Sequence, residues 1–211
     1  MKVLAINGSP KAEGNTFFAL KTAAQALEDA GIETEILHIG QEAVRGCIAC
    51  GQCARNKNEK CVLPGDSVND WIQKMKEADG ILLGTPVHYS AIGASMKAFL
   101  DRAFYVAGAN GGLFRHKVGA AVVAVRRSGG VTTFDQMNHY LLYSEMLIPT
   151  ANYWNVIHGA KPGEAAEDTE GVQIMRVLGK NMAWLMQLVA HGKGAVPEPE
   201  REQKVYMNFI R

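Results

Sequence analysis

Short apolar segments alternate along the chain with amphipathic segments, in which apolar residues recur every three or four positions. The apolar or alternating segments predict strands at residues 3–6, 33–39, 80–85, 118–125 and 152–158. The amphipathic segments predict a helix from residue 16 to a C-cap at Gly31, and further helices at 68–75, 91–103, 137–146 and 171–190. Because strands and helices alternate, we expect a parallel sheet with helices on both faces.

The predicted fold is therefore α/β, with a doubly wound five-stranded parallel sheet in the flavodoxin-like order 2-1-3-4-5. We expect one domain over residues 1–193, with a cysteine-rich loop at 46–65 inserted in it. Residues 194–211 are expected to form an extended tail, because Pro197 and Pro199 cannot continue the last helix. The tail ends on apolar residues, which dock either on a partner subunit or on the chain's own domain. These residues are Val205, Tyr206, Met207, Phe209 and Ile210.

Composition and charge narrow the class of protein. Of the 211 residues, 47% are hydrophobic and 20% are charged, which excludes global disorder, collagen and a disulfide scaffold. The formal net charge of +1 gives no indication of binding to nucleic acid or to an anionic membrane. No apolar run reaches the roughly 18 residues of a membrane span, and the first apolar run is too short for a secretory signal. We therefore expect a cytoplasmic protein.

The loop after the first strand has the features of an anion site. Ligands of doubly wound sheets bind at the carboxyl ends of the strands, and the backbone N–H groups and dipole of a following helix favour a phosphate. Either Asn15 or Thr16 is suited as the N-cap of that helix. The spacing of Gly8 and Gly14 differs from that of a P-loop. The alternative is a well-capped turn without a ligand. The candidate phosphate-binding residues are Ser9, Lys11, Gly14, Asn15 and Thr16.

Two further loops follow the third and fourth predicted strands at the same edge. Pro86 turns the backbone away from the sheet, and Val87, His88 and Tyr89 come next, so this segment can cover a flat aromatic ligand. Ser128, Gly129 and Gly130 follow the fourth strand, where paired glycines allow close approach of a ligand. The alternatives are half-buried side chains and a plain flexible loop. Together the three loops suit a ligand of the size of FMN.

All four cysteines lie in one segment with the spacing C-x2-C-x2-C-x7-C. Cys47, Cys50, Cys53 and Cys61 provide four thiolates, and ferredoxins use a similarly dense run to bind a [4Fe–4S] cluster. Three alternatives remain: a loop without metal, a tetrahedral zinc site, and a redox dithiol.

The first loop, with the sequence Gly8-Ser9-Pro10-Lys11-x-x-Gly14-Asn15-Thr16, resembles the phosphate loop of the NADPH-dependent FMN reductase family. The segment 84–89, followed by 96–102 (MKAFLDR), is similar to a second signature of that family, and residues 126–130 stand where the family has its glycine-rich flavin loop. The cysteine motif resembles that of the archaeal and bacterial iron-sulfur flavoproteins. The resemblance covers roughly residues 1–190. It implies non-covalently bound FMN, with Ser9, Lys11, Asn15 and Thr16 at the phosphate and residues 86–89 and 128–130 at the isoalloxazine, and a homodimer or homotetramer.

These observations lead to an FMN-dependent oxidoreductase or electron-transfer flavoprotein with a [4Fe–4S] cluster. The flavin performs the chemistry, so no catalytic side chain is named. We expect NAD(P)H or a redox protein such as ferredoxin as electron donor, and a small molecule or redox protein as acceptor. The alternatives are a cluster-free NAD(P)H-dependent reductase of FMN or quinones, and a non-enzymatic flavin electron carrier.

Overall fold

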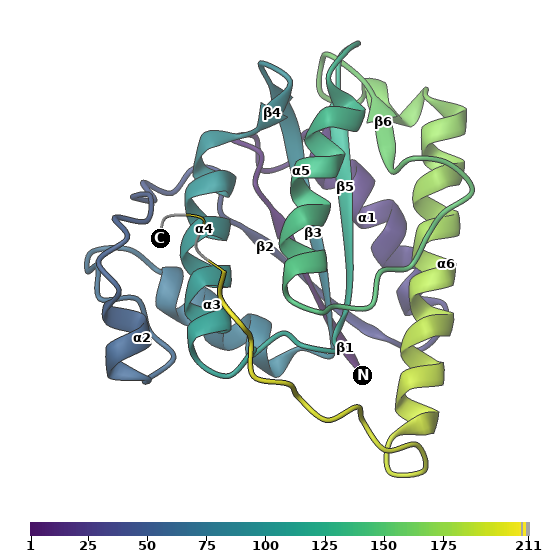
Figure 1. Ribbon diagram of the computed structural model, residues 1–211. Helices are drawn as coiled ribbons and strands as arrows, with labels where there is room; N and C mark the ends of the chain where they lie inside the picture. The colour runs from purple at the N-terminus through teal and green to yellow at the C-terminus, as the bar shows by residue number, and fades with distance from the viewer. Residues whose placement is uncertain (208, 210–211) are drawn as a thin grey trace.

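The computed structural model describes residues 1–207 and 209, and at its centre lies a twisted parallel sheet (Figure 1). The five parallel strands are β1 (Lys2–Asn7), β2 (Glu33–His38), β3 (Gly80–His88), β5 (Val118–Val125) and β6 (Val156–His158). They are ordered β2-β1-β3-β5-β6, and each is parallel to its neighbours. This arrangement confirms the predicted doubly wound, flavodoxin-like order.

Helices cover both faces of the sheet. The helices α1 (Asn15–Glu28) and α6 (Thr169–Gly192) pack on one face. The other face is covered by α3 (Val68–Glu77), α4 (Ala94–Ala109) and α5 (Gly130–Tyr143), as Figure 1 shows. Successive residues of β1 point to opposite faces, so Val3 joins the α1–α6 core and Leu4 joins the α3–α4–α5 core. Two hydrophobic cores therefore hold the strand ends in place.

Several boundaries differ from those predicted. The two-residue strand β4 (Ala91–Ile92) pairs antiparallel with the end of β3, so the helix α4 begins at Ala94 rather than at residue 91. The helix α5 begins at Gly130 instead of residue 137, and β6 begins at Val156 instead of residue 152. Two short elements were not predicted, the helix α2 (Gln52–Asn56) and the 3-10 helix η1 (Glu164–Ala166). The helix α1 ends at Glu28, and Gly31 has a positive φ in the turn that follows.

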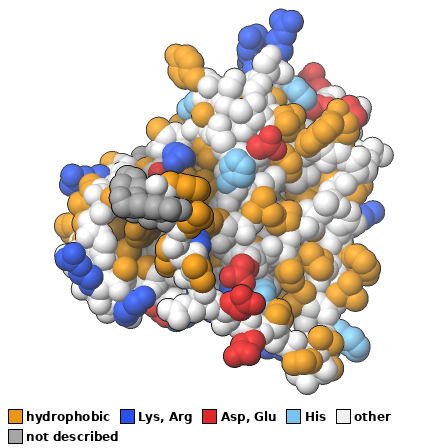
Figure 2. Space-filling view, viewed as in Figure 1, with side chains coloured by type: hydrophobic (Ala, Val, Ile, Leu, Met, Phe, Trp, Pro, Cys, Tyr) orange, Lys and Arg blue, Asp and Glu red, His pale blue; other side chains and the backbone are white. Residues whose placement is uncertain are grey.

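The tail leaves the end of α6 and crosses the front of the molecule toward α4 (Figure 1). Polar contacts hold it on its own domain: Arg115 donates to the carbonyl of Pro199 at 3.1 Å, and Lys204 donates to the Tyr143 hydroxyl at 2.6 Å. The apolar side chains of Val205, Tyr206, Met207 and Phe209 are nevertheless exposed. Ile210 lies outside the described residues. Figure 2 shows several hydrophobic side chains on the face of the molecule that the tail crosses, and docking on a partner subunit stays a prediction.

Among residues 1–207 and 209, no helix combines the length and the apolar character that crossing a membrane requires.

Candidate functional site

The structure brings three of the predicted loops together at the carboxyl edge of the sheet. The N–H of Gly8, after β1, donates to the carbonyl of Gly84 in β3 at 2.8 Å. Gly129, after β5, lies against Ser90, and a Cβ on Gly129 would stand 2.6 Å from the Ser90 hydroxyl oxygen. The candidate residues of the first, third and fourth strand ends are therefore neighbours in space.

Asn7, at the end of β1, organises the first loop. Its side chain is fully buried, donates to the carbonyl of Ala12 at 2.9 Å and accepts from the N–H of Ser9 at 3.1 Å. The Ser9 hydroxyl in turn accepts from the N–H of Lys11 at 3.1 Å. These bonds close the loop into one defined shape. Sequence reasoning missed Asn7, although an asparagine followed by glycine after a strand is a turn signal.

The start of α1 differs from the prediction, because its N-cap is Gly14 and neither Asn15 nor Thr16 caps it. The Asn15 side chain instead accepts from the N–H of Ala165 at 3.3 Å, which ties the helix start to η1. Thr16 is buried. No side chain of the described residues caps α1, so the N–H groups of its first turn remain available to an anion, with exposed Lys11 nearby in the same loop.

Residues at the end of β2 and just after it contact the first loop, and sequence reasoning missed them. An imidazole nitrogen of His38 lies 2.7 Å from the carbonyl oxygen of Ser9. Gly40 packs against the same carbonyl so closely that a Cβ there would lie 1.9 Å from its oxygen. The only sequence signal was a glycine directly after a strand.

The segment after β3 is a tight hairpin. Val87 pairs with Ile92 and His88 with Ala91, which leaves Tyr89 and Ser90 as a two-residue turn with φ values of 51° and 59°. Left-handed backbone costs a non-glycine residue roughly 1–2 kcal/mol, and such strain is concentrated at functional sites. Tyr89 projects from the tip, completely exposed, so its ring is free to stack on a flat ligand.

The candidate residues in the loop after β5 differ in their exposure to solvent. Ser128 is exposed, whereas Gly129 is the N-cap of α5 with a φ of 86°, a conformation that favours glycine. Gly130 is buried, and a Cβ there would meet Val156 at 2.6 Å. Because Gly130 has no side chain, α5 can pack closely on β6. Beside this loop a cavity of about 330 Å³ extends to the exposed rings of Tyr153 and Trp154.

Lys97, Asp101 and Tyr140 form a polar cluster where α4 meets α5. Lys97 and Asp101 line an open hollow together with His88 and Tyr89, and the Tyr140 hydroxyl donates to Asp101 at 2.5 Å. Burial raises the pKa of Tyr140 to about 12, and its hydrogen bond to Asp101 acts in the same direction.

This shift predicts a loss of stability in alkali that Tyr140→Phe removes. An unfolded tyrosine ionises near pH 10, so between about pH 10 and about pH 12 the unfolded chain releases a proton that the folded chain keeps. The stabilisation is complete below the unfolded pKa, and up to about 2 kcal/mol is lost as the pH rises through this window. Urea unfolding of both proteins across the window measures the difference. If the free energy of unfolding falls with pH equally in both proteins, the raised pKa of Tyr140 is contradicted.

The cysteine segment, residues 46–65, follows β2 in the chain, contains α2 and lies beside α4 (Figure 1). All four cysteines are free thiols and line one small hollow against α4. Cys53 is buried on α2, which follows a left-handed turn at Gly51 with a φ of 70°. Burial raises the pKa of the Cys53 thiol, and nearby Cys61 and Cys47 act in the same direction. Within the described residues, no three His, Cys, Asp or Glu side chains are grouped around the position of a single metal ion.

Side chains from the neighbouring helices fix the segment in place. Asn69 of α3 accepts from the N–H of Cys61 at 2.7 Å and donates to its carbonyl at 2.9 Å. Asn110, after α4, accepts from the N–H of Glu59 at 3.0 Å and donates to the carbonyl of Cys53 at 3.4 Å. The N–H of Ala49 donates to the Cys47 sulfur at 3.4 Å. The donor set of four thiols around one hollow, with an N–H group already directed at sulfur, fits an iron-sulfur cluster.

Arg102 of α4 contacts the same segment. Its Nε donates to the Cys61 sulfur at 3.3 Å, and its Nη2 donates to a carboxylate oxygen of Asp66 at 3.1 Å. Burial works to lower the pKa of Arg102, but the hydrogen bonds to Asp66 and Cys61 outweigh burial, so the pKa is raised. Arg102 was noted in the sequence only as part of a signature, and its contact with a cysteine was not predicted.

Comparison with known proteins agrees with this geometry. The family model of the NADPH-dependent FMN reductases matches residues 1–161. An iron-sulfur flavoprotein of Methanocaldococcus jannaschii is 37% identical over 196 residues, which cover 90% of this chain and 99% of that protein. A second, from Methanosarcina thermophila, is 30% identical over 190 residues and covers 90% of this chain and 97% of its own.

The fold is also similar to that of a solved structure, the NAD(P)H:quinone oxidoreductase from Methanothermobacter marburgensis. The TM-score is 0.64 at 15% identity, over 86% of this chain and 96% of that one. The family match extends over most of the chain and includes all three loops described above. The chain therefore belongs to the NADPH-dependent FMN reductase family and is an FMN-dependent oxidoreductase.

Proposed function

We propose that this FMN-dependent oxidoreductase also binds one [4Fe–4S] cluster per chain through Cys47, Cys50, Cys53 and Cys61, and that it transfers electrons between the flavin and the cluster. The observation that carries the proposal is the single hollow lined by all four free thiols. The relatives from Methanocaldococcus jannaschii and Methanosarcina thermophila are named iron-sulfur flavoproteins, which supports the same assignment.

The proposed role of the first loop is to bind the FMN phosphate. The N–H groups at the start of α1 and the hydroxyls of Ser9 and Thr16 provide hydrogen bonds, and Lys11 provides charge. Asn15 fixes the helix start through its contact with Ala165, and Gly14 is the N-cap of that helix. The loop holds these groups in place before the ligand arrives, so little ordering is needed on binding.

The hairpin and the β5–α5 loop are proposed to hold the isoalloxazine. The backbone of Pro86–Tyr89 borders the ring on one side, with Tyr89 free to cover it, and Ser128 and Gly129 approach from the other loop. Gly130 keeps α5 close enough to β6 for that approach. Bound FMN exchanges electrons in pairs or singly, so the protein has to bind and orient the ring rather than supply an acid or base.

The electron donor and the assembly are part of the proposal. NAD(P)H or a ferredoxin-like protein is the proposed donor, and a small molecule or redox protein is the proposed acceptor. We propose a homodimer or homotetramer, to which the exposed apolar side chains of the tail contribute.

Anaerobic reconstitution tests the proposed cofactors. We expect protein incubated with FMN, ferrous iron and sulfide and then desalted to retain one FMN, and about four iron and about four sulfide ions per chain. The absorbance spectrum should combine flavin bands with a broad shoulder that is lost on reduction. Cys50→Ser should lose the iron and keep the FMN, because Cys50 lies outside the three flavin loops. Bleaching by NAD(P)H identifies the donor.

Two outcomes would contradict parts of the proposal. Retention of FMN without iron, in parent and Cys50→Ser protein alike, would leave a cluster-free reductase. Retention of FMN and cluster without bleaching by NAD(P)H would assign the role of electron donor to a redox protein.

A further inference from the structure

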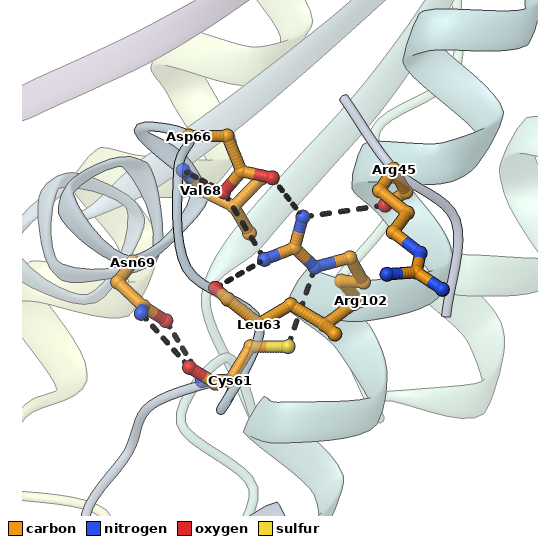
Figure 3. A network of polar contacts seen from close by, with 7 residues as sticks. All are labelled: Arg45, Cys61, Leu63, Asp66, Val68, Asn69 and Arg102. Atoms are coloured by element: carbon orange, nitrogen blue, oxygen red, sulfur yellow. Dashed lines mark hydrogen bonds and ion pairs between the residues drawn. The ribbon is translucent and has the colours of Figure 1, made fainter. Parts of the chain in front are cut away.

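A buried arginine lies at the side of the cysteine segment. Arg102 is 1% exposed, and Figure 3 shows its guanidinium surrounded by groups of the segment between residues 45 and 66. A guanidinium carries five N–H donors and stays charged at any working pH. Each of the five has an acceptor here. Such complete pairing shows that the surrounding backbone is shaped around this one side chain.

The five acceptors come from both ends of the segment. The carbonyl of Arg45, just before Cys47, accepts at 3.2 Å, and the carbonyl of Leu63, just after Cys61, accepts at 3.3 Å. The Asp66 carboxylate pairs with both Nη atoms. Arg102 therefore ties the start of the cysteine segment to its end and to α4, which anchors a stretch that has little regular structure of its own.

The fifth acceptor is the sulfur of Cys61, which accepts from Nε at 3.3 Å. A neutral thiol is a weak acceptor, whereas a cysteine sulfur that ligates iron carries negative charge and accepts strongly from a cation. Asp66 balances the charge of Arg102, and its side chain is 6% exposed. Packing alone does not explain this choice of residues, because apolar side chains of similar size stabilise a buried site equally well.

We infer that Arg102 is a positioning residue that holds Cys61 in ligating position and, through its N–H···S hydrogen bond, raises the reduction potential of the cluster. This inference rests on the proposed function of the four cysteines. The physical reason is that one-electron reduction adds negative charge to the cluster and its sulfurs, so a donor directed at sulfur stabilises the reduced form more than the oxidised form.

The test compares a double and a single variant. Arg102→Met with Asp66→Asn removes the sulfur contact and leaves the net charge of the site unchanged, and it avoids a lone buried charge. Asp66→Asn alone keeps the contact and removes one negative charge. Each protein is reconstituted anaerobically with FMN, iron and sulfide. The reduction potential of the cluster is then measured by titration with dithionite, which supplies the single electron, followed by electron paramagnetic resonance.

We expect the double variant to disfavour cluster reduction about tenfold relative to the parent, a downward shift of about 59 mV for one electron. Asp66→Asn should shift the potential upward or leave it unchanged. Equal potentials in the double variant and the parent would overturn the inference. An equal fall in both variants would overturn it as well, because distortion of the loop would then explain the change.

A second measurement needs no cluster. In metal-free protein, trypsin cleavage after Lys57 and Lys60 reports how firmly the segment is held, since both residues are exposed. We expect cleavage of the double variant to be at least about tenfold faster than that of the parent, because both ends of the segment lose their anchor. Unchanged cleavage would overturn the positioning role. If the parent retains no iron, the proposed cluster fails, whereas faster cleavage of the double variant still supports the anchor.

Discussion

Gly179→Ala is expected to lower the free energy of unfolding by about 2 kcal/mol or more, toward the upper end of the usual cost of overpacking. Gly179 lies where α6 crosses α1, and a Cβ there would stand 2.3 Å from the carbonyl oxygen of Ala23 and 2.8 Å from the Cβ of Ala26. A helix backbone cannot rotate out of the way as a side chain can, so α6 has to move away from α1. Urea denaturation and the melting temperature measure the loss.

Gly108→Ala is the matched control for this prediction. Gly108 lies in α4, and a Cβ there would meet no atom within 4 Å. Alanine favours a helix over glycine by about 1 kcal/mol, so this variant should be slightly more stable than the parent. The same propensity gain applies at Gly179 and has to be outweighed by the close contact. A stable Gly179→Ala protein would show that the two helices separate at little cost.

The three central strands β1, β3 and β5 could be predicted because most of their side chains are buried on both faces. A strand of this kind is a nearly continuous apolar run, as at residues 118–125, and such runs are visible in the sequence alone. The edge strand β2 is only half-buried and was visible instead through its alternation of polar and apolar residues. The hairpin after β3 could not be predicted in this way. Tyr89 and Ser90 adopt left-handed backbone without glycine or asparagine, and the two residues of β4 are too few to show a period. Gly129 lies against this turn, and a contact over such a separation in sequence is not encoded in any local pattern.

The residues of the candidate site likewise fall into two groups, those that the sequence indicated and those that only the structure revealed. Local motifs identified Ser9 and the cysteines, because a strand-loop-helix junction and a thiol spacing are properties of adjacent residues. Gly40 packs against Ser9, which lies 31 positions earlier in the sequence. Arg102 contacts Cys61, which lies 41 positions earlier. No local pattern encodes contacts of that separation. The structure is therefore needed to find the residues that support the candidate loops, as distinct from those within them.

Gly40→Ala is expected to weaken FMN binding by about 100-fold or more, although residue 40 belongs to none of the predicted binding loops. A Cβ at this position would lie 1.9 Å from the carbonyl oxygen of Ser9 and 2.8 Å from the nitrogen of Pro10, whereas real Cβ atoms keep at least 3.0 Å from such backbone atoms. The loop therefore has to move by about an ångström. A hydrogen bond to a charged phosphate is worth about 1.5–3 kcal/mol, so losing two of them gives at least this fold-change.

Fluorescence titration of the cofactor-free protein with FMN measures the dissociation constant, because the flavin emission changes on binding. Gly108→Ala again serves as control, since it introduces the same methyl group on α4 without any neighbour, and it should bind FMN as the parent does. Circular dichroism and the melting temperature, taken without FMN, separate a displaced loop from an unfolded domain. A folded Gly40→Ala protein with the affinity of the parent would mean that the Ser9 loop does not hold the phosphate. The anion site would then have to be sought at the start of α5, where Gly129 leaves the first-turn N–H groups without a side-chain cap.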